Sequence, residues 1–138
     1  MKVLYTASAA ATGDGRNGHV QSTDGLIDTD VRMPPEMGGP GGATNPEQLF
    51  AAGYAACFHS ALKLVASNAG ADTTDSEVVA DVSIGTADDG GFGLAVQLEV
   101  SLPRVGAETA RELVERAHQV CPYSNATRGN IEVTLTVA

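Results

Sequence analysis

Two cysteines are the residues of this chain best suited to chemistry, and they lie far apart in a sequence of 138 residues. Cys57 lies inside an apolar segment, and Cys121 directly precedes Pro122, which ends a different segment. A thiol close to a positive charge and to a second thiol is a nucleophile that can form a reversible disulfide, whereas a buried unpaired thiol is an inert small hydrophobe. The residues alone leave both interpretations open.

Composition narrows the classes of protein. The formal net charge of -9 and the pI near 4.5 argue against nucleic-acid binding, which requires a basic surface. A hydrophobic share of 43% suits one domain over residues 1–138. We expect no signal peptide and no membrane span, and therefore a cytoplasmic protein. In that reducing compartment two cysteines are more often catalytic, redox-sensing or metal-binding than a permanent disulfide.

The elements that must position these cysteines follow from hydrophobic periodicity and turn residues. A Gly/Pro-rich loop over residues 33–42 precedes a long helix, for which Thr44 or Asn45 supplies the N-cap and Gly70 the end. Alternation of apolar and polar residues predicts strands elsewhere, and a helical stripe predicts a second helix. The expected order is strands at 3–7, 19–21 and 25–31, helix 46–69, a hairpin of strands 77–85 and 92–102, helix 108–120 and strand 131–137.

Four sequence blocks resemble one family. They are the glycine-rich run 38–42, the segment 44–58 around Cys57, the short segment 91–94, and the segment 117–131 around Cys-Pro-Tyr-Ser-Asn-Ala. These blocks are similar to the organic hydroperoxide resistance proteins, a branch of the OsmC-like superfamily. The resemblance implies an α+β fold of antiparallel sheets packed around long central helices in an intertwined homodimer. It also implies a thiol peroxidase that reduces organic hydroperoxides, including those of fatty acids, to alcohols.

The resemblance assigns roles to four residues. Cys57 would be the peroxidatic thiol, Cys121 the resolving thiol, Arg16 the cation beside the thiolate, and Glu47 the carboxylate that holds the arginine. The chemistry independently favours these residue types. Only a thiolate attacks peroxide efficiently, and a guanidinium, which never loses its charge, stabilises a thiolate beside it. The resemblance implies no bound cofactor, and an external reductant that is dihydrolipoamide or a lipoylated protein.

Residues of these types also occur in proteins without any catalytic role. Cys57 could be core packing, Arg16 an ordinary loop arginine, and Glu47 a surface carboxylate that complements a helix dipole. The sequence departs from the family pattern near Asp14, where an extra residue is expected to shift the loop that carries Arg16.

Further residues are candidates for the substrate site. Phe50, Tyr54 and Phe58 flank the cysteine helix, and Met33 and Met37 could close an apolar wall over a bulky hydroperoxide. We expect no metal, since His118 and Cys121 lack a second pair at metal-ligand spacing.

Two other functions remain as alternatives. A non-enzymatic apolar-ligand carrier or oxidant sensor could use the same cysteine pair, with the disulfide as its signal. A cysteine hydrolase has less support, because His59 would point about 200° around the helix from Cys57.

The spacing of Glu47 and Cys57 has a consequence for assembly. Ten positions on one helix correspond to about 15 Å of rise. One arginine could then serve both residues only if the chain breaks after Pro46 or if a second subunit supplies the carboxylate. The small residues around Cys57 favour the second subunit, because they allow two such helices to approach closely.

Overall fold

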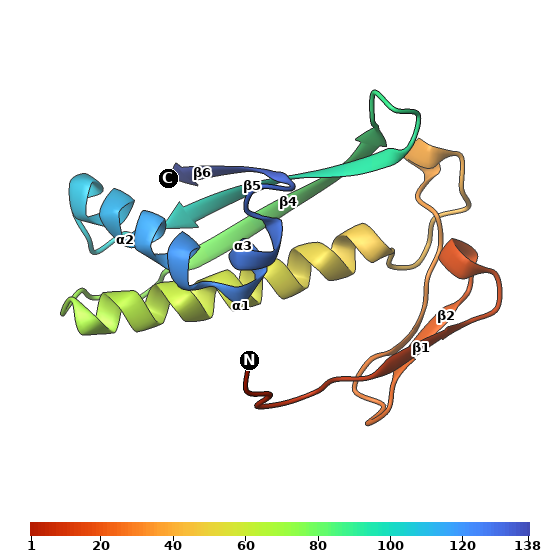
Figure 1. Cartoon of the computed structure of the whole chain (residues 1–138), viewed down its shortest axis with the longest axis horizontal. Helices are drawn as coiled ribbons and strands as arrows, with labels where there is room; N and C mark the ends of the chain where they lie inside the picture. Colours follow the sequence, from red (N-terminus) through yellow and green to blue (C-terminus); the bar gives the residue numbers. More distant parts are fainter. The chain divides into compact units, whose positions relative to one another are not determined.

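The computed structural model describes all 138 residues and divides them into two compact units, residues 1–49 and residues 50–138. We call these the N-terminal and the C-terminal unit (Figure 1). The prediction of a single domain stays a prediction. The elements are β1 (Ala9–Thr12), η1 (Gly15–Asn17), β2 (His19–Ser22), β3 (Asp28–Asp30), η2 (Pro35–Met37), α1 (Pro46–Asn68), β4 (Glu77–Thr86), β5 (Phe92–Ser101), α2 (Ala107–Val120), α3 (Pro122–Thr127) and β6 (Glu132–Val137).

The N-terminal unit is built on a small antiparallel sheet with the strand order β1-β2-β3. The prediction of a strand over residues 3–7 is wrong, because β1 begins at Ala9. Val3, Leu4 and Tyr5 have strand-forming side chains but no partner strand, and β-propensity without a partner does not form a ladder. Val31 is the one buried hydrophobic residue of this unit, which therefore has almost no core of its own.

Helix α1 begins and ends close to the predicted positions. The side-chain oxygen of Asn45 accepts a hydrogen bond from the backbone N–H of Gln48 at 2.9 Å, which is the expected N-cap. Pro46 occupies the first turn, where its missing N–H costs nothing. Past the last residue of the helix, Gly70 adopts a positive φ of 70° that favours glycine.

By length and composition alone, α1 is also apolar enough to cross a membrane. A core helix passes the same test, and α1 has the buried face of a core helix. Its residues Tyr54, Phe58, Leu62 and Val65 are fully or almost fully buried in the hydrophobic cluster of the C-terminal unit.

The sheet of the C-terminal unit has the order β4-β5-β6 and confirms the predicted hairpin. Strands β4 and β5 are paired antiparallel from Glu77 opposite Ser101 to Thr86 opposite Phe92. One pairing differs from the antiparallel sheets expected: β6 runs parallel to β5. The reason is the connection, since α2 and α3 carry the chain back before β6 begins, as a parallel pair requires.

One hydrophobic core holds the C-terminal unit together. Alternate residues of the sheet point to one face, and α1 and α2 pack there (Figure 1). The fully buried members include Leu62 of α1, Leu98 and Val100 of β5, and Leu113 of α2. The periodic stripe predicted for α2 is confirmed, because Ala110, Leu113, Val114 and Ala117 are its buried residues.

The short helix α3 is not among the elements predicted from the sequence. Pro122 was expected to end a helix, and it does end α2, but it also occupies the first turn of a new helix of six residues. The chain therefore turns at Cys121, which lies between α2 and α3 and is buried.

Candidate active site

The structure brings the two cysteines together within the C-terminal unit. The Cys121 thiol donates to Cys57 Sγ, and the two sulfur atoms are 3.6 Å apart. Both thiols are free, Cys121 fully buried and Cys57 half-buried. A disulfide bond is about 2.05 Å long, so a small shift of either side chain would join the sulfurs.

The sulfur atoms meet because α3 packs closely against α1. The ring of Tyr123 lies over Gly53, where a Cβ atom would come within 3.0 Å of the tyrosine hydroxyl. Phe50 and Tyr54 pack against the same ring, with centroids 6.3 and 5.7 Å away. Glycine at position 53 is therefore explained by close approach between the two helices.

Burial makes Cys57 a weak acid within its own unit. Desolvation raises the pKa of the Cys57 thiol, and the neighbouring Cys121 raises it further, while the backbone N–H of Tyr123 acts in the opposite direction. The net shift is upward, away from the thiolate that attacks peroxides. A positive charge close to the sulfur would act in the opposite direction and favour the thiolate.

A hollow opens beside Cys57 on the surface of the C-terminal unit. Its volume is about 440 Å³, and its lining consists of Cys57, Ser60, Ala61, Leu64, Val120 and Pro122. Leu64 and Val120 are about half exposed, at 54% and 47%. The half-buried thiol is therefore accessible through a largely apolar entrance.

The residues predicted to contact the substrate differ in burial and lie in both units. Tyr54 and Phe58 expose none of their surface and belong to the core, so they do not line the hollow. Phe50 is partly buried against the core. Met33 is partly exposed and Met37 is 37% exposed, both in the N-terminal unit.

Arg16 and Glu47 form a paired ion bridge in the N-terminal unit. Nη1 and Nη2 of Arg16 donate to the two carboxylate oxygens of Glu47 at 2.9 and 2.8 Å. This is the pair of hydrogen bonds expected from the sequence, and its catalytic role stays a prediction. The hydrogen bond to Glu47 raises the pKa of Arg16, and the same contact lowers the pKa of Glu47, so both groups stay charged.

The extra residue near Asp14 does not prevent this contact. The chain forms a 3-10 turn in which the backbone N–H of Asn17 donates to the Asp14 carbonyl at 3.0 Å. Gly18 follows this turn and lies close to the backbone of Thr12. A Cβ atom at position 18 would collide with the carbonyl oxygen of Thr12, so this close approach requires glycine. The Asn17 side chain accepts from the backbone N–H of Met33 at 2.9 Å and ties the loop to the next segment.

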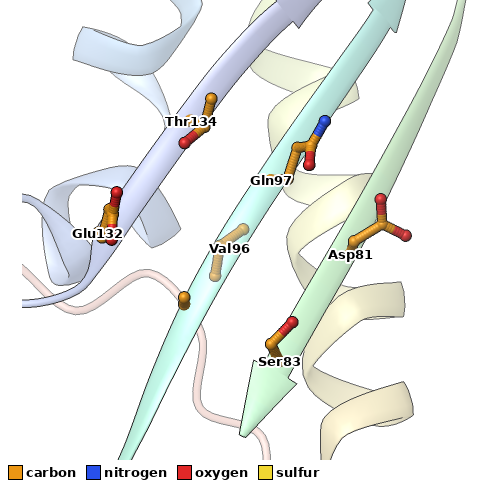
Figure 2. A pocket seen from close by; sticks show the side chains of 7 residues that line it. Asp81, Ser83, Val96, Gln97, Glu132 and Thr134 are labelled. Carbon is orange, nitrogen blue, oxygen red and sulfur yellow. The ribbon is translucent and has the colours of Figure 1, made fainter. Parts of the chain in front are cut away.

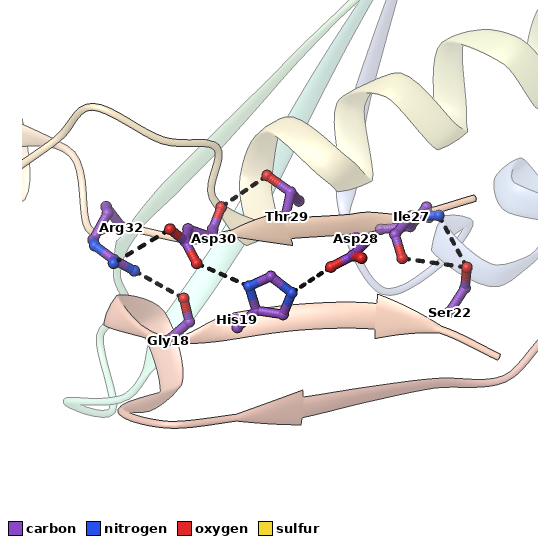
Figure 3. Close-up of polar contacts among 8 residues, drawn as sticks. All are labelled: Gly18, His19, Ser22, Ile27, Asp28, Thr29, Asp30 and Arg32. Atoms are coloured by element: carbon purple, nitrogen blue, oxygen red, sulfur yellow. Dashed lines mark hydrogen bonds and ion pairs between the residues drawn. The ribbon is translucent and has the colours of Figure 1, made fainter. Parts of the chain in front are cut away.

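A charged cluster fixes the strands that follow the arginine loop (Figure 3). His19 donates from Nδ1 to Asp30 at 2.8 Å and from Nε2 to Asp28 at 2.6 Å, which requires the protonated ring. Arg32 donates to the carbonyl of Gly18 at 2.8 Å. The hydrogen bonds to Asp30 and then Asp28 raise the pKa of His19.

Other features of the surface lack the groups for this chemistry. A second hollow of about 210 Å³ lies over the outer face of the sheet, where Asp81, Gln97 and Glu132 point outward (Figure 2). It contains no thiol and no cation. His59 donates or accepts at Ser76, 2.8 Å away, and has no contact with Cys57. No group of three or more His, Cys, Asp or Glu side chains is arranged to hold a metal ion.

Comparison with known proteins identifies the family. The model of the family "OsmC-like protein" matches residues 39–136. An organic hydroperoxide resistance protein of Xanthomonas axonopodis is 54% identical, over 99% of this chain and 96% of the relative. The chain belongs to the OsmC-like family, in the branch of the organic hydroperoxide resistance proteins.

Solved structures of that branch have the same fold. The organic hydroperoxide resistance protein of Elizabethkingia anophelis is 57% identical, with a TM-score of 0.94 over 100% of this chain and 99% of that one. The OhrB protein of Bacillus subtilis is 47% identical, with a TM-score of 0.90 over 99% and 100% of the two chains. The α+β fold expected from the sequence is thus confirmed.

The His19 cluster predicts a specific dependence of stability on pH. Because the folded pKa is raised, the stabilisation is complete below the unfolded pKa of about 6.5 and is lost as the pH rises through the folded value. We expect the difference in unfolding free energy between the wild type and His19→Gln to shrink from pH 6 to alkaline pH. Denaturant unfolding at a series of pH values measures it.

A second histidine provides the control for that experiment. Burial lowers the pKa of His118, so the difference between the wild type and His118→Gln should grow as the pH rises from the folded pKa to the unfolded value of about 6.5 and stay constant above it. A His19→Gln difference that stays constant with pH would contradict the charged form of the cluster.

Proposed function

We propose that this protein is a thiol peroxidase that reduces organic hydroperoxides to alcohols with Cys57 and Cys121. Membership of its family supports the coarser statement, a role in organic hydroperoxide resistance. The observation that carries the finer one is the 3.6 Å separation of two free thiols, one buried and one beside an apolar hollow. This arrangement suits one thiol that meets the oxidant and one that resolves the product.

The first step is attack by the Cys57 thiolate on the terminal peroxide oxygen. The O–O bond breaks, the alkoxide takes up a proton and leaves as the alcohol, and Cys57 becomes a sulfenic acid. The sulfur is oxidised by two electrons, and the peroxide is reduced by two. A guanidinium held near the sulfur would stabilise both the thiolate and the negative charge that develops on oxygen.

The second step closes a disulfide. Cys121 attacks the sulfur of the Cys57 sulfenic acid, the S–O bond breaks, and one molecule of water leaves. An external dithiol then exchanges with the disulfide, becomes a disulfide itself, and returns both cysteines to thiols. We propose dihydrolipoamide or a lipoylated protein as that dithiol, on the family resemblance.

The apolar hollow beside Cys57 is suited to the hydrocarbon part of the substrate. Leu64, Val120 and Pro122 offer surface to an alkyl or aryl chain, and each buried methylene contributes about 0.8 kcal/mol. Hydrogen peroxide has no such surface. These three residues replace Tyr54 and Phe58 as the proposed substrate contacts, because both aromatic side chains are in the core.

We further propose a homodimer in which the partner subunit supplies the cation. Helix α1 is continuous from Pro46 to Asn68, so the alternative of a chain break after Pro46 has no support. Glu47 and Cys57 are then about 15 Å apart along the axis of one helix. The Arg16–Glu47 pair of one subunit would serve the Cys57 of the other.

Two surfaces support that assembly. Ala52, Ala56 and Ser60 form an exposed row of small residues on α1 at four-residue spacing, which allows a second helix to approach closely. Only 33% of the most apolar stretch of α1 is buried within the chain. The N-terminal unit also exposes Leu4 and Leu26 at 91% and 87%, and a three-stranded sheet with so little core needs a further surface to be stable.

Turnover distinguishes a peroxidase from a carrier or sensor. With excess dihydrolipoamide, we expect many equivalents of cumene hydroperoxide to be consumed per subunit, at a specificity constant at least about tenfold above that for hydrogen peroxide, since burial of two or three methylene equivalents suffices. Product alcohol and residual hydroperoxide are measured over time. A sensor would be oxidised once and stop, and equal constants for both peroxides would contradict the role of the hollow.

Single cysteine variants in the same assay show which thiol attacks the peroxide and which one resolves the sulfenic acid. Cys57→Ser should consume no hydroperoxide, whereas Cys121→Ser should consume one equivalent to form the sulfenic acid of Cys57 and one more for each further step of oxidation, with the products identified by mass spectrometry. Equal loss of the first oxidation in both variants would show that the roles are wrongly assigned.

Mixed dimers test the shared site. Cys57→Ser mixed with Glu47→Ala should give heterodimers with one intact site and partial activity, because the remaining Cys57 faces the remaining Glu47. The matched control pairs the wild type with the double variant Cys57→Ser/Glu47→Ala, which leaves no intact site if the two residues act across subunits. Verified heterodimers with the opposite pattern would show that each subunit completes its own site.

A further inference from the structure

Three buried hydroxyl groups connect the two segments that carry the cysteines. Tyr54 lies on α1, about one turn before Cys57, while Ser124 and Thr127 lie on α3, which begins directly after Cys121. The Tyr54 hydroxyl oxygen is 2.8 Å from Ser124 Oγ and 3.1 Å from Thr127 Oγ1. None of the three side chains exposes more than 2% of its surface.

The direction of each hydrogen bond follows from counting protons. Thr127 donates its hydroxyl proton to the carbonyl oxygen of Ser124, 3.2 Å away, and so accepts from Tyr54. The Tyr54 proton is then used, and Ser124 must donate to Tyr54. All three protons have an acceptor, in a chain that runs from α3 to α1 and back.

We propose that Tyr54 is a positioning residue for disulfide formation, because its hydroxyl holds α3 against α1 and keeps Cys121 within reach of Cys57. The inference rests on the peroxidase function proposed above. It assigns to Tyr54 a part in the second step, closure of the disulfide, and none in the attack on peroxide.

These hydrogen bonds lie close to both cysteines in the chain, so they can fix the distance between the two sulfur atoms. The tyrosine hydroxyl is anchored within one helical turn of Cys57, and its partner Ser124 is three residues past Cys121. Close to these hydrogen bonds in the chain, the sulfur atoms of Cys57 and Cys121 are 3.6 Å apart. Because the link is fully buried, water does not compete for its hydrogen bonds, and removing one partner leaves another polar group unsatisfied in the core.

The chemical consequence concerns a competition at Cys57. Its sulfenic acid either condenses with Cys121, releasing water, or reacts with a second hydroperoxide to give a sulfinic acid and another alcohol. The first path depends on how closely Cys121 is held, and the second only on peroxide concentration. Loosening α3 should therefore shift the outcome toward over-oxidation without changing the first attack.

The test is a single-turnover experiment on the full-length reduced protein. In Tyr54→Phe we expect disulfide formation after one equivalent of cumene hydroperoxide to slow about tenfold, the effect of roughly one buried hydrogen bond. With excess peroxide, the sulfinic fraction of Cys57 should rise accordingly. Acid quenching, alkylation and mass spectrometry quantify the disulfide, sulfenic and sulfinic forms.

A second variant guards against damage to the core by the first. Ser124→Ala removes the donor to Tyr54 and leaves α1 unchanged, so it should produce the same shift toward sulfinic acid. Val100→Ala, a truncation of a fully buried residue in β5, lowers stability without removing any hydrogen bond between α1 and α3 and should leave the partition unchanged.

Measurements in the Cys121→Ser background separate this inference from the proposed function. There, Tyr54→Phe should leave the rate of the first oxidation within about twofold, since the lost hydrogen bond acts on α3 and not on the peroxide. Normal disulfide formation in both hydroxyl variants, or an equal shift in Val100→Ala, would overturn the positioning role. Failure of Cys121→Ser to consume any hydroperoxide would instead overturn the peroxidase function.

Discussion

The protonation of one half-buried thiol is the constraint on which the proposed function of this protein depends. Cys57 must be close to Cys121 to form a disulfide, and the packing that brings the sulfurs to 3.6 Å also removes water and raises the pKa of Cys57. A raised pKa favours the protonated thiol over the nucleophilic thiolate. The proposed solution is the permanently charged guanidinium of Arg16, which Glu47 holds in place.

In the proposed function, different parts of the chain meet these two requirements. The C-terminal unit contains a full hydrophobic core and supplies a rigid frame for the thiols, because α1 and α3 are held by close contact at Gly53 and by the buried hydroxyl of Tyr54. The N-terminal unit has almost no core and supplies the Arg16–Glu47 pair. A homodimer would join these parts and cover the exposed row of small residues on α1.

Local signals in the sequence account for what could be predicted. The N-cap at Asn45 and the alternation in β4 and β5 are properties of neighbouring residues, and these elements occur where expected. The cysteine pairing came from the family resemblance. The short helix α3 and the parallel strand β6 depend on tertiary contacts, and apolar residues such as Phe58 do not reveal whether they face a substrate or the core.

The most direct test of the account is the ionisation of Cys57 in the Cys121→Ser protein, followed by thiolate absorbance as the pH is raised. With Arg16 present, the thiolate should form at least about one pH unit lower than in the additional variant Arg16→Gln, as expected when an opposite charge is removed from contact. Identical titration curves for the two proteins would show that Arg16 does not act on Cys57, and would contradict the proposed activation of the thiol.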